Sequence, residues 1–170
     1  MIIDLTTITD KNTSFDFFIP ADEINLEDEA VKLNDAVKIQ GNLIKGIAQT
    51  DVRGKIAADV ELECSRCLQT VQNFLEFPFQ AVFVTPENYT EEREAQVGIE
   101  DLEVSIFGGD KIDLKELARE QILLALPAQV FCLEECKGLC QKCGANKNLI
   151  NCSCEEKEVD PRWAALKDLK

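Results

Sequence analysis

The chain has 170 residues with a hydrophobic fraction of 45%, which suit one buried domain, or one domain with a small metal-stabilised appendage. Its 8 glycines and 5 prolines are too few for a disordered or fibrous protein. Its formal net charge of −14 means that the surface as a whole should repel the phosphates of nucleic acids. Histidine is absent, which removes the commonest general base and every Ser-His or Cys-His catalytic pair, so we expect no enzyme activity.

From its first residues we expect no secretory signal. Met1 to Lys11 contain Asp4 and Asp10 and lack both a basic leader and a sustained apolar stretch. No run in the chain approaches the ~18–20 apolar residues of a membrane helix. We therefore expect a cytoplasmic protein without a membrane partner. In that compartment disulfides are rare, and the eight cysteines favour metal or redox chemistry.

The first half of the chain has the patterns of antiparallel strands. Residues 13–19 predict a strand, and the acid-rich residues 22–35 predict a surface connection. Residues 37–48 and 52–63 should then pair across a turn at residues 49–51. Together they indicate an antiparallel meander.

Alternation of apolar and polar residues is strongest in the segment that leads to the first cysteine. Even-numbered positions from Val52 to Leu62 are apolar or small, and the same count places Cys64 on the apolar face. Residues 71–83 alternate likewise. Pro78 lies on the opposite face of that segment, which predicts an edge strand or a bulge.

The region after this sheet predicts a solvated loop, a short strand and one helix. Residues 85–103 are acidic and should form the loop, and residues 102–107 the strand. Asp113 is placed as the helix N-cap, Glu116 follows three residues later as in a capping box, and Pro127 stops the helix. We expect this helix to pack on the sheet.

The cysteines have the spacing of metal ligands. Two residues between cysteines let one backbone turn direct both sulfurs at the same ion, and Gly144 suits such a turn because it tolerates positive φ. The run does not match the common C-x2-C-x2-C-x3-C-P spacing of ferredoxins, although a mononuclear iron stays possible as an alternative to zinc. The predicted ligands are Cys64, Cys67, Cys132, Cys136, Cys140, Cys143, Cys152 and Cys154.

The number of ions is left open at one or two. In the first arrangement the last four cysteines hold one zinc, while Cys64, Cys67, Cys132 and Cys136 hold a second that pins the tail to the sheet. In the rival arrangement a single zinc binds the first pair and two tail cysteines. The sequence favours structural zinc over a redox role for the Cys-x-x-Cys pairs, because acidic residues just before Cys64 disfavour a reactive thiolate.

Basic residues near the cysteines form the candidate contact surface for a partner. Lys137, Lys142 and Lys147 lie in a segment without acidic residues and could contact RNA phosphate, or could simply offset thiolate charge. Arg66 could contact a partner or donate to a thiolate sulfur. Trp163, on a short helix expected after Asp160, more often caps its own core than anchors a partner.

Several motifs in a fixed order resemble the YceD-like family of large ribosomal RNA subunit accumulation proteins. Glu63 to Cys67 is the first motif, residues 122–127 the second, and Cys136 to Asn146 the third, followed by Cys152-Ser153-Cys154 and by Asp160-Pro161-Arg162 with Leu166. The chain departs from the family's usual pattern at Gln141, where proline is usual, and at Lys147, where leucine is usual. Neither departure affects a cysteine.

The resemblance implies a bacterial or organelle-type ribosome biogenesis factor that promotes accumulation of large-subunit (23S) ribosomal RNA. It implies metal-binding cysteines and no established enzyme activity. The partner would be large-subunit ribosomal RNA or a basic ribosomal protein, with no small-molecule substrate. The alternatives are a cytosolic thiol oxidoreductase and a structural zinc adaptor unrelated to ribosomes.

The expected fold class is α+β. We expect an antiparallel, partly barrel-like sheet with one covering helix, followed by a C-terminal Cys-rich zinc-binding segment. Residues 1–130 would form the sheet and helix domain, and residues 131–170 the Cys-rich tail packed on it.

Overall fold

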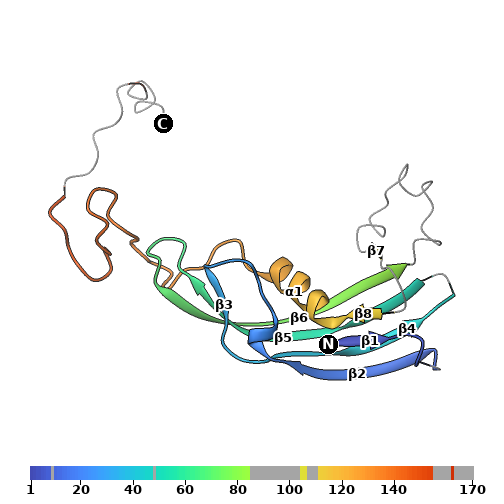
Figure 1. Cartoon of the computed structure of the whole chain (residues 1–170). Helices are drawn as coiled ribbons and strands as arrows, with labels where there is room; N and C mark the ends of the chain where they lie inside the picture. Colours follow the sequence, from blue (N-terminus) through green and yellow to red (C-terminus); the bar gives the residue numbers. More distant parts are fainter. Residues whose placement is uncertain (9, 48, 85–103, 107–110, 155–161, 163–170) are drawn as a thin grey trace.

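The computed structural model describes residues 1–8, 10–47, 49–84, 104–106, 111–154 and 162. These residues form an α+β protein with a curled, mostly antiparallel sheet, as the sequence predicts (Figure 1). Its elements are β1 (Ile2–Asp4), β2 (Asn12–Ile19), the 3-10 helix η1 (Ala21–Glu23), β3 (Val31–Leu33), β4 (Val37–Lys45), β5 (Gln49–Glu63), β6 (Thr70–Val84), β7 (Val104–Ile106), β8 (Lys111–Asp113) and α1 (Leu114–Ala125).

Within the described residues, the larger sheet has the strand order β2-β4-β5-β6-β7, and β3 pairs with β5 beside β4. All of these pairs are antiparallel except β6 with β7, which are parallel. The strands β1 and β8 form a separate two-stranded sheet. Since β4 pairs with β5 up to Ala57 and β3 pairs with it from Val60 to Leu62, β3 supports the end of β5 that leads to Cys64.

The alternation along β5 is confirmed by its burial. Val52, Ile56 and Val60 are fully buried in the core, while the odd-numbered residues between them face away from it. Cys64 continues this face and is fully buried as well. The two-residue period of the strand therefore places Cys64 on the buried face, at the end of β5.

Helix α1 covers the sheet and adds to the same core. Its buried face includes Leu114, Leu117 and Ile122, and Figure 1 shows the helix lying over the strands. The predicted N-cap is confirmed, because the carboxylate of Asp113 accepts a hydrogen bond from the N–H of Lys115 at 2.9 Å. The carboxylate of Glu116 does not complete a capping box, since it accepts from the guanidinium of Arg119.

Two sequence expectations about connections are wrong. The turn between β4 and β5 does not lie at residues 49–51, because β5 already begins at Gln49 and the N–H of Gly46 donates to the carbonyl of Gln49 at 2.9 Å. Residues 22–35 are not merely a surface connection. They contain β3, and Ile24, Leu26 and Val31 are buried in the core.

Other expectations concern the sheet edge and the tail. Pro78 pairs in register with Lys55, and β7 reaches only Val82–Val84, so the proline lies on an edge stretch of β6 within the described residues. The strand predicted at residues 102–107 is observed as β7. The predicted loop at 85–103 and the helix bearing Trp163 lie outside the described residues. No helix in the described part of the chain is long and apolar enough to cross a membrane.

Candidate metal centres

Four cysteines from distant parts of the sequence meet at the end of β5. Cys64 and Cys67 flank the turn that follows β5, and Cys132 and Cys136 come from the segment after α1. We call this group the sheet cluster. The segment is held against the turn because the N–H of Ser65 donates to the carbonyl of Val130 at 2.8 Å.

The four sulfurs of the sheet cluster have the separations of ligands around one ion. Cys64 Sγ lies 3.8 Å from Cys136 Sγ, Cys67 Sγ lies 3.4 Å from Cys132 Sγ, and all four sulfurs lie within 4.8 Å of one another. A tetrahedral zinc with Zn–S bonds of about 2.3 Å has sulfurs about 3.8 Å apart, whereas a disulfide needs about 2.05 Å. The donor set and its size therefore fit a tetrahedral thiolate-bound metal.

The electrostatics of the sheet cluster also favour a cation. Burial acts to raise the pKa of Cys64, but backbone N–H groups of Arg66, Cys132 and Cys67 donate to its sulfur and lower its pKa to about 6. The side chain of Cys67 and burial raise the pKa of Cys132 to about 12. Neighbouring thiolates repel each other, so ionising one cysteine raises the pKa of the next. A bound cation would offset this repulsion and favour the thiolate form of all four.

A second group of four cysteines lies within the tail. Cys140, Cys143, Cys152 and Cys154 also have sulfurs within 4.8 Å of one another, and we call them the tail cluster. Cys140 is buried, whereas Cys143 and Cys154 are exposed. The backbone N–H groups of Cys143 and Lys142 lower the pKa of Cys140 to about 6. These two clusters are the sets proposed in the two-ion arrangement.

The two Cys-x-x-Cys turns have the same backbone hydrogen bonds. The N–H of Leu68 donates to the carbonyl of Cys64 at 2.9 Å, and the N–H of Gly144 donates to the carbonyl of Cys140 at 2.8 Å. Each first cysteine also donates its own N–H, at 2.8 Å, to the carbonyl five residues later. The residue after each pair has positive φ, +59° at Leu68 and +73° at Gly144.

Comparison with known proteins covers this same region. The family described as Large ribosomal RNA subunit accumulation protein YceD matches residues 52–170, a range that contains all eight cysteines. The chain belongs to the YceD family. No solved structure matches it.

Several curated relatives resemble this YceD chain. Uncharacterized protein YlbN of Bacillus subtilis (strain 168) is 32% identical over 157 residues, which cover 84% of this chain and 86% of the relative. An uncharacterized protein of Mycobacterium tuberculosis (strain ATCC 25618 / H37Rv) is 30% identical over 118 residues, and the match spans 54% of that relative. The Arabidopsis thaliana protein named Large ribosomal RNA subunit accumulation protein YCED homolog 1, chloroplastic, is 35% identical over 60 residues, 35% of this chain and 19% of the relative.

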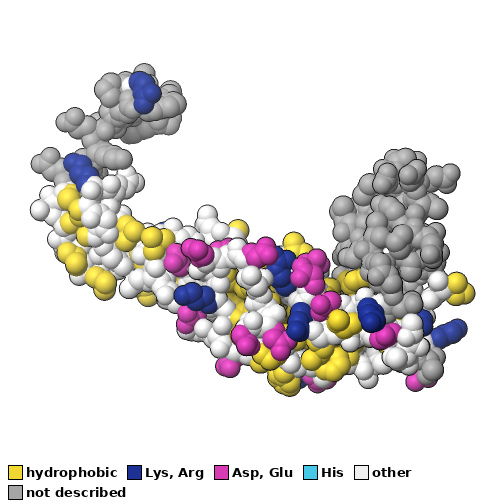
Figure 2. All heavy atoms as spheres, in the orientation of Figure 1, with side chains coloured by type: hydrophobic (Ala, Val, Ile, Leu, Met, Phe, Trp, Pro, Cys, Tyr) yellow, Lys and Arg dark blue, Asp and Glu magenta, His cyan; other side chains and the backbone are white. Residues whose placement is uncertain are grey.

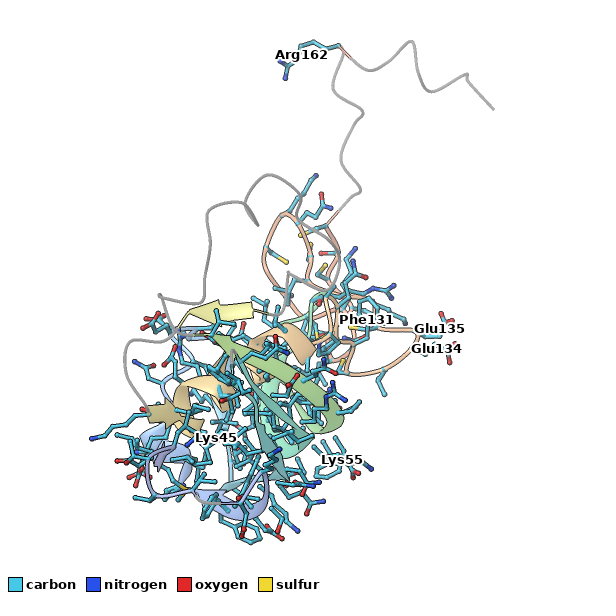
Figure 3. All side chains as sticks on the ribbon, turned by 90° about the vertical axis from the view of Figure 1, so that its right-hand side faces the viewer. Lys45, Lys55, Phe131, Glu134, Glu135 and Arg162 are labelled. Atoms are coloured by element: carbon cyan, nitrogen blue, oxygen red, sulfur yellow. The ribbon has the colours of Figure 1, made fainter. Side chains whose placement is uncertain are left out.

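Arg66 of this YceD chain contacts carbonyl groups of the tail. Its guanidinium donates to the carbonyls of Cys136 at 3.0 Å and Glu134 at 3.4 Å and lies over the ring of Phe131, 4.3 Å from its centroid. Figure 3 shows that Phe131, Glu134 and Glu135 lie together in the loop after α1, with both carboxylates pointing away from the body of the molecule. Arg66 thus holds the tail against the turn after β5, and within the described residues its guanidinium donates to carbonyl groups and to no sulfur. Its role in binding a partner stays a prediction.

The three lysines of the tail remain a candidate contact surface. Lys137 and Lys142 are exposed and Lys147 is half-buried. Within residues 131–154, none of the three forms an ion pair. Their charge is therefore available to a partner, and partner binding stays a prediction.

Asn148 is a site residue whose role the sequence alone does not indicate. Its side-chain N–H donates to Cys136 Sγ at 3.2 Å, although Asn148 lies in the loop of the tail cluster. The available signal was the pair Asn146 and Asn148 between the cysteine pairs, since short amides often bond to nearby backbone. Sequence spacing alone does not indicate which sulfur such an amide would meet.

Proposed function

We propose that this YceD chain is a non-enzymatic cytoplasmic factor that promotes accumulation of large-subunit (23S) ribosomal RNA. The observation that carries the proposal is the family match over residues 52–170, which includes both cysteine clusters. The name of the Arabidopsis relative supports the same process. The complete lack of histidine agrees with a binding role, because the usual acid-base groups of hydrolases are missing.

In this proposal each cluster holds one zinc ion in a structural role. Four cysteine ligands leave no open coordination position, which is typical of structural rather than catalytic zinc. The sheet cluster would fasten the tail to the end of β5, and the tail cluster would close the loop between Cys140 and Cys154. Elemental analysis of the purified chain should find two zinc equivalents. A single equivalent would contradict the two-site assignment.

The partner in this proposal is large-subunit ribosomal RNA or a basic ribosomal protein. The chain has a net charge of −14, and each four-thiolate zinc site adds about −2 because four thiolates meet one divalent ion. Figure 2 shows acidic and basic side chains interspersed over the body of the molecule. RNA contact would therefore be local, through the tail lysines Lys137, Lys142 and Lys147, while a basic protein could use the acidic surface.

Depletion of the protein tests the cellular role. We expect the ratio of 23S to 16S ribosomal RNA to fall and free large subunits to decrease on sucrose gradients. Expression of the intact chain should restore both, and a chain with the sheet cluster disabled by Cys64→Ser and Cys67→Ser should not. Unchanged ribosomal RNA and subunit profiles after depletion would refute the proposed function.

Affinity capture with and without RNase separates the two partner classes. Loss of the captured ribosomal components on RNase treatment identifies RNA as the direct partner, and their retention identifies a protein. A Lys137→Ala/Lys142→Ala variant should weaken capture if the tail lysines make the contact. The matched control is Lys32→Ala/Lys55→Ala, which removes two exposed lysines from the sheet.

A further inference from the structure

One asparagine of the tail loop contacts a ligand of the sheet cluster. Asn148 lies between Cys143 and Cys152, in the loop that the tail cluster closes. Its side-chain Nδ2 donates to the Sγ of Cys136 at 3.2 Å, and its Oδ1 accepts from the backbone N–H of Lys137 at 2.8 Å. Both ends of this amide therefore bond to a sheet-cluster ligand or its neighbour.

The amide of Asn148 is positioned by its own loop. Its backbone N–H and its Nδ2 each donate to the Oδ1 of Asn146 at 2.9 Å. The N–H of the intervening Lys147 donates to the carbonyl of Gly138 at 2.9 Å, and Leu139 forms an isolated antiparallel bridge with Asn146. The two Nδ2 hydrogens and the carbonyl oxygen are thus all used, so the amide has a single well-defined orientation.

A hydrogen bond of this kind affects how tightly a ligand holds its metal. Donors to first-shell ligands orient them, and their loss typically lowers metal affinity about 10–100-fold. The position of Asn148 depends on a closed loop, and a metal ion bound by Cys143 and Cys152 on either side of it would close that loop.

We infer that Asn148 couples the two clusters, so that a metal ion in the tail cluster raises the affinity of the sheet cluster for its own ion. The inference rests on the proposed function in one respect, namely that both clusters bind metal. Because coupling between two binding equilibria is reciprocal, an ion in the sheet cluster raises the affinity of the tail cluster by the same factor. The tail would then load its ions cooperatively.

A double-mutant cycle on the full chain tests the coupling. Cys152→Ser with Cys154→Ser disables the tail cluster and leaves all four sheet-cluster sulfurs, whose zinc affinity is measured by competition with a chromophoric chelator. With Asn148 present, disabling the tail cluster should weaken zinc binding at the sheet cluster about tenfold. In the Asn148→Ala background the same change should have no further effect. Independent, additive effects of the two changes would overturn the coupling.

Two further variants make the result specific. Asn151→Ala alters an exposed asparagine of the same loop and should leave zinc affinity at the sheet cluster unchanged. Asn148→Asp keeps an oxygen for the N–H of Lys137 but places a carboxylate beside the Cys136 thiolate, so it should weaken binding more than Asn148→Ala does. Equal affinity in Asn148→Asp and the parent chain would also overturn the coupling.

The measurement separates this inference from the proposed metal sites. A parent chain that takes up no zinc would refute both. A chain that binds two zinc ions with affinities insensitive to Asn148→Ala would refute the coupling alone. Co²⁺ substitution gives an independent readout, since the thiolate-to-cobalt absorption reports sulfur ligation directly.

Discussion

The turn at Cys64 and the turn at Cys140 share their backbone geometry but have different residues at the position of positive φ. Leu68 has φ +59° in the first turn, and Gly144 has φ +73° in the second. A left-handed conformation costs an L-residue about 1–2 kcal/mol, whereas glycine adopts it freely. The two turns therefore provide a matched pair of substitutions at the scale of one residue.

Gly144→Ala should weaken zinc binding at the tail cluster. A Cβ at this position would meet no atom within 4 Å, so the cost is conformational, about 1 kcal/mol or about fivefold in affinity. Leu68→Gly should strengthen zinc binding at the sheet cluster, because glycine adopts positive φ without strain. The change loses little packing, since the Leu68 side chain is exposed. Zinc competition titrations measure both. If Gly144→Ala bound zinc as tightly as the parent chain, the left-handed turn would not be required.

Arg66→Ala should loosen the tail from the sheet. The change removes hydrogen bonds to the carbonyls of Cys136 and Glu134 and the stacking on Phe131, together about 1–2 kcal/mol. Faster zinc release to a chelator would report the effect, and Arg66→Lys should be intermediate because it lacks the planar fork. The control is Arg53→Ala on β5, whose exposed ion pair should contribute less than about 0.5 kcal/mol.

Several residue roles in the site could not be predicted from the sequence. Cysteine spacing indicated that the tail and the first pair bind metal, and it allowed the grouping that the structure shows. It could not identify Asn148 as a donor to Cys136, because that contact depends on how two loops pack. For the same reason, the sequence does not indicate that the guanidinium of Arg66 donates to carbonyl groups of the tail.

Among the elements, β4 and β5 place two glycines opposite each other where their backbones leave no room for a side chain. Gly41 and Gly54 are opposite each other in register. A Cβ on Gly54 would lie 2.1 Å from the carbonyl oxygen of Gln40, and one on Gly41 would lie 2.2 Å from that of Arg53. Neither strand can carry a side chain at this point without moving the backbone of the other.

Gly54→Ala should therefore destabilise the sheet. Relief of the clash requires a backbone shift in the centre of the larger sheet, which typically costs about 1–3 kcal/mol. Urea unfolding followed by circular dichroism would show the lower midpoint. Lys55→Ala, at the adjacent exposed position, should stay within about 0.5 kcal/mol of the parent chain. A midpoint for Gly54→Ala as high as that of Lys55→Ala would contradict the close approach.

The elements that the sequence predicted best are those with regular burial. The alternation of apolar and polar residues predicts β5 and the burial of Cys64. Asp113, as an N-cap residue, predicts the start of α1. The turn after β4 was misplaced because Thr50, a polar residue, is buried and extends β5 beyond the apolar pattern. The sequence does not predict β3, because its few apolar residues lie in an acid-rich segment that has the composition of a surface connection. Its pairing with β5 is long-range and leaves no local signal.

At the scale of the whole molecule, the sheet and the cysteine-rich region have separate cores. The larger core joins strands and helix through residues such as Ile19, Ile56 and Ile122 and contains no cysteine. The smaller one consists of Cys64, Cys67 and Cys136, with Val71, Cys132 and Leu139 packed against it. The sheet thus has an apolar core of its own, whereas the tail depends on sulfur-lined contacts.

Metal removal should consequently release the tail without unfolding the sheet. Thiolates that lose their cation repel one another, so the sheet cluster should open and the backbone bonds across it should be lost, including Leu139 N–H to the carbonyl of Arg66. Hydrogen exchange with mass spectrometry, with and without a zinc chelator, should show faster exchange in residues 131–154. The amides of β4 should keep their protection, because their neighbours in the apolar core remain packed. Loss of protection in both regions at the same chelator concentration would instead make the molecule one cooperative unit and contradict the division near residue 130.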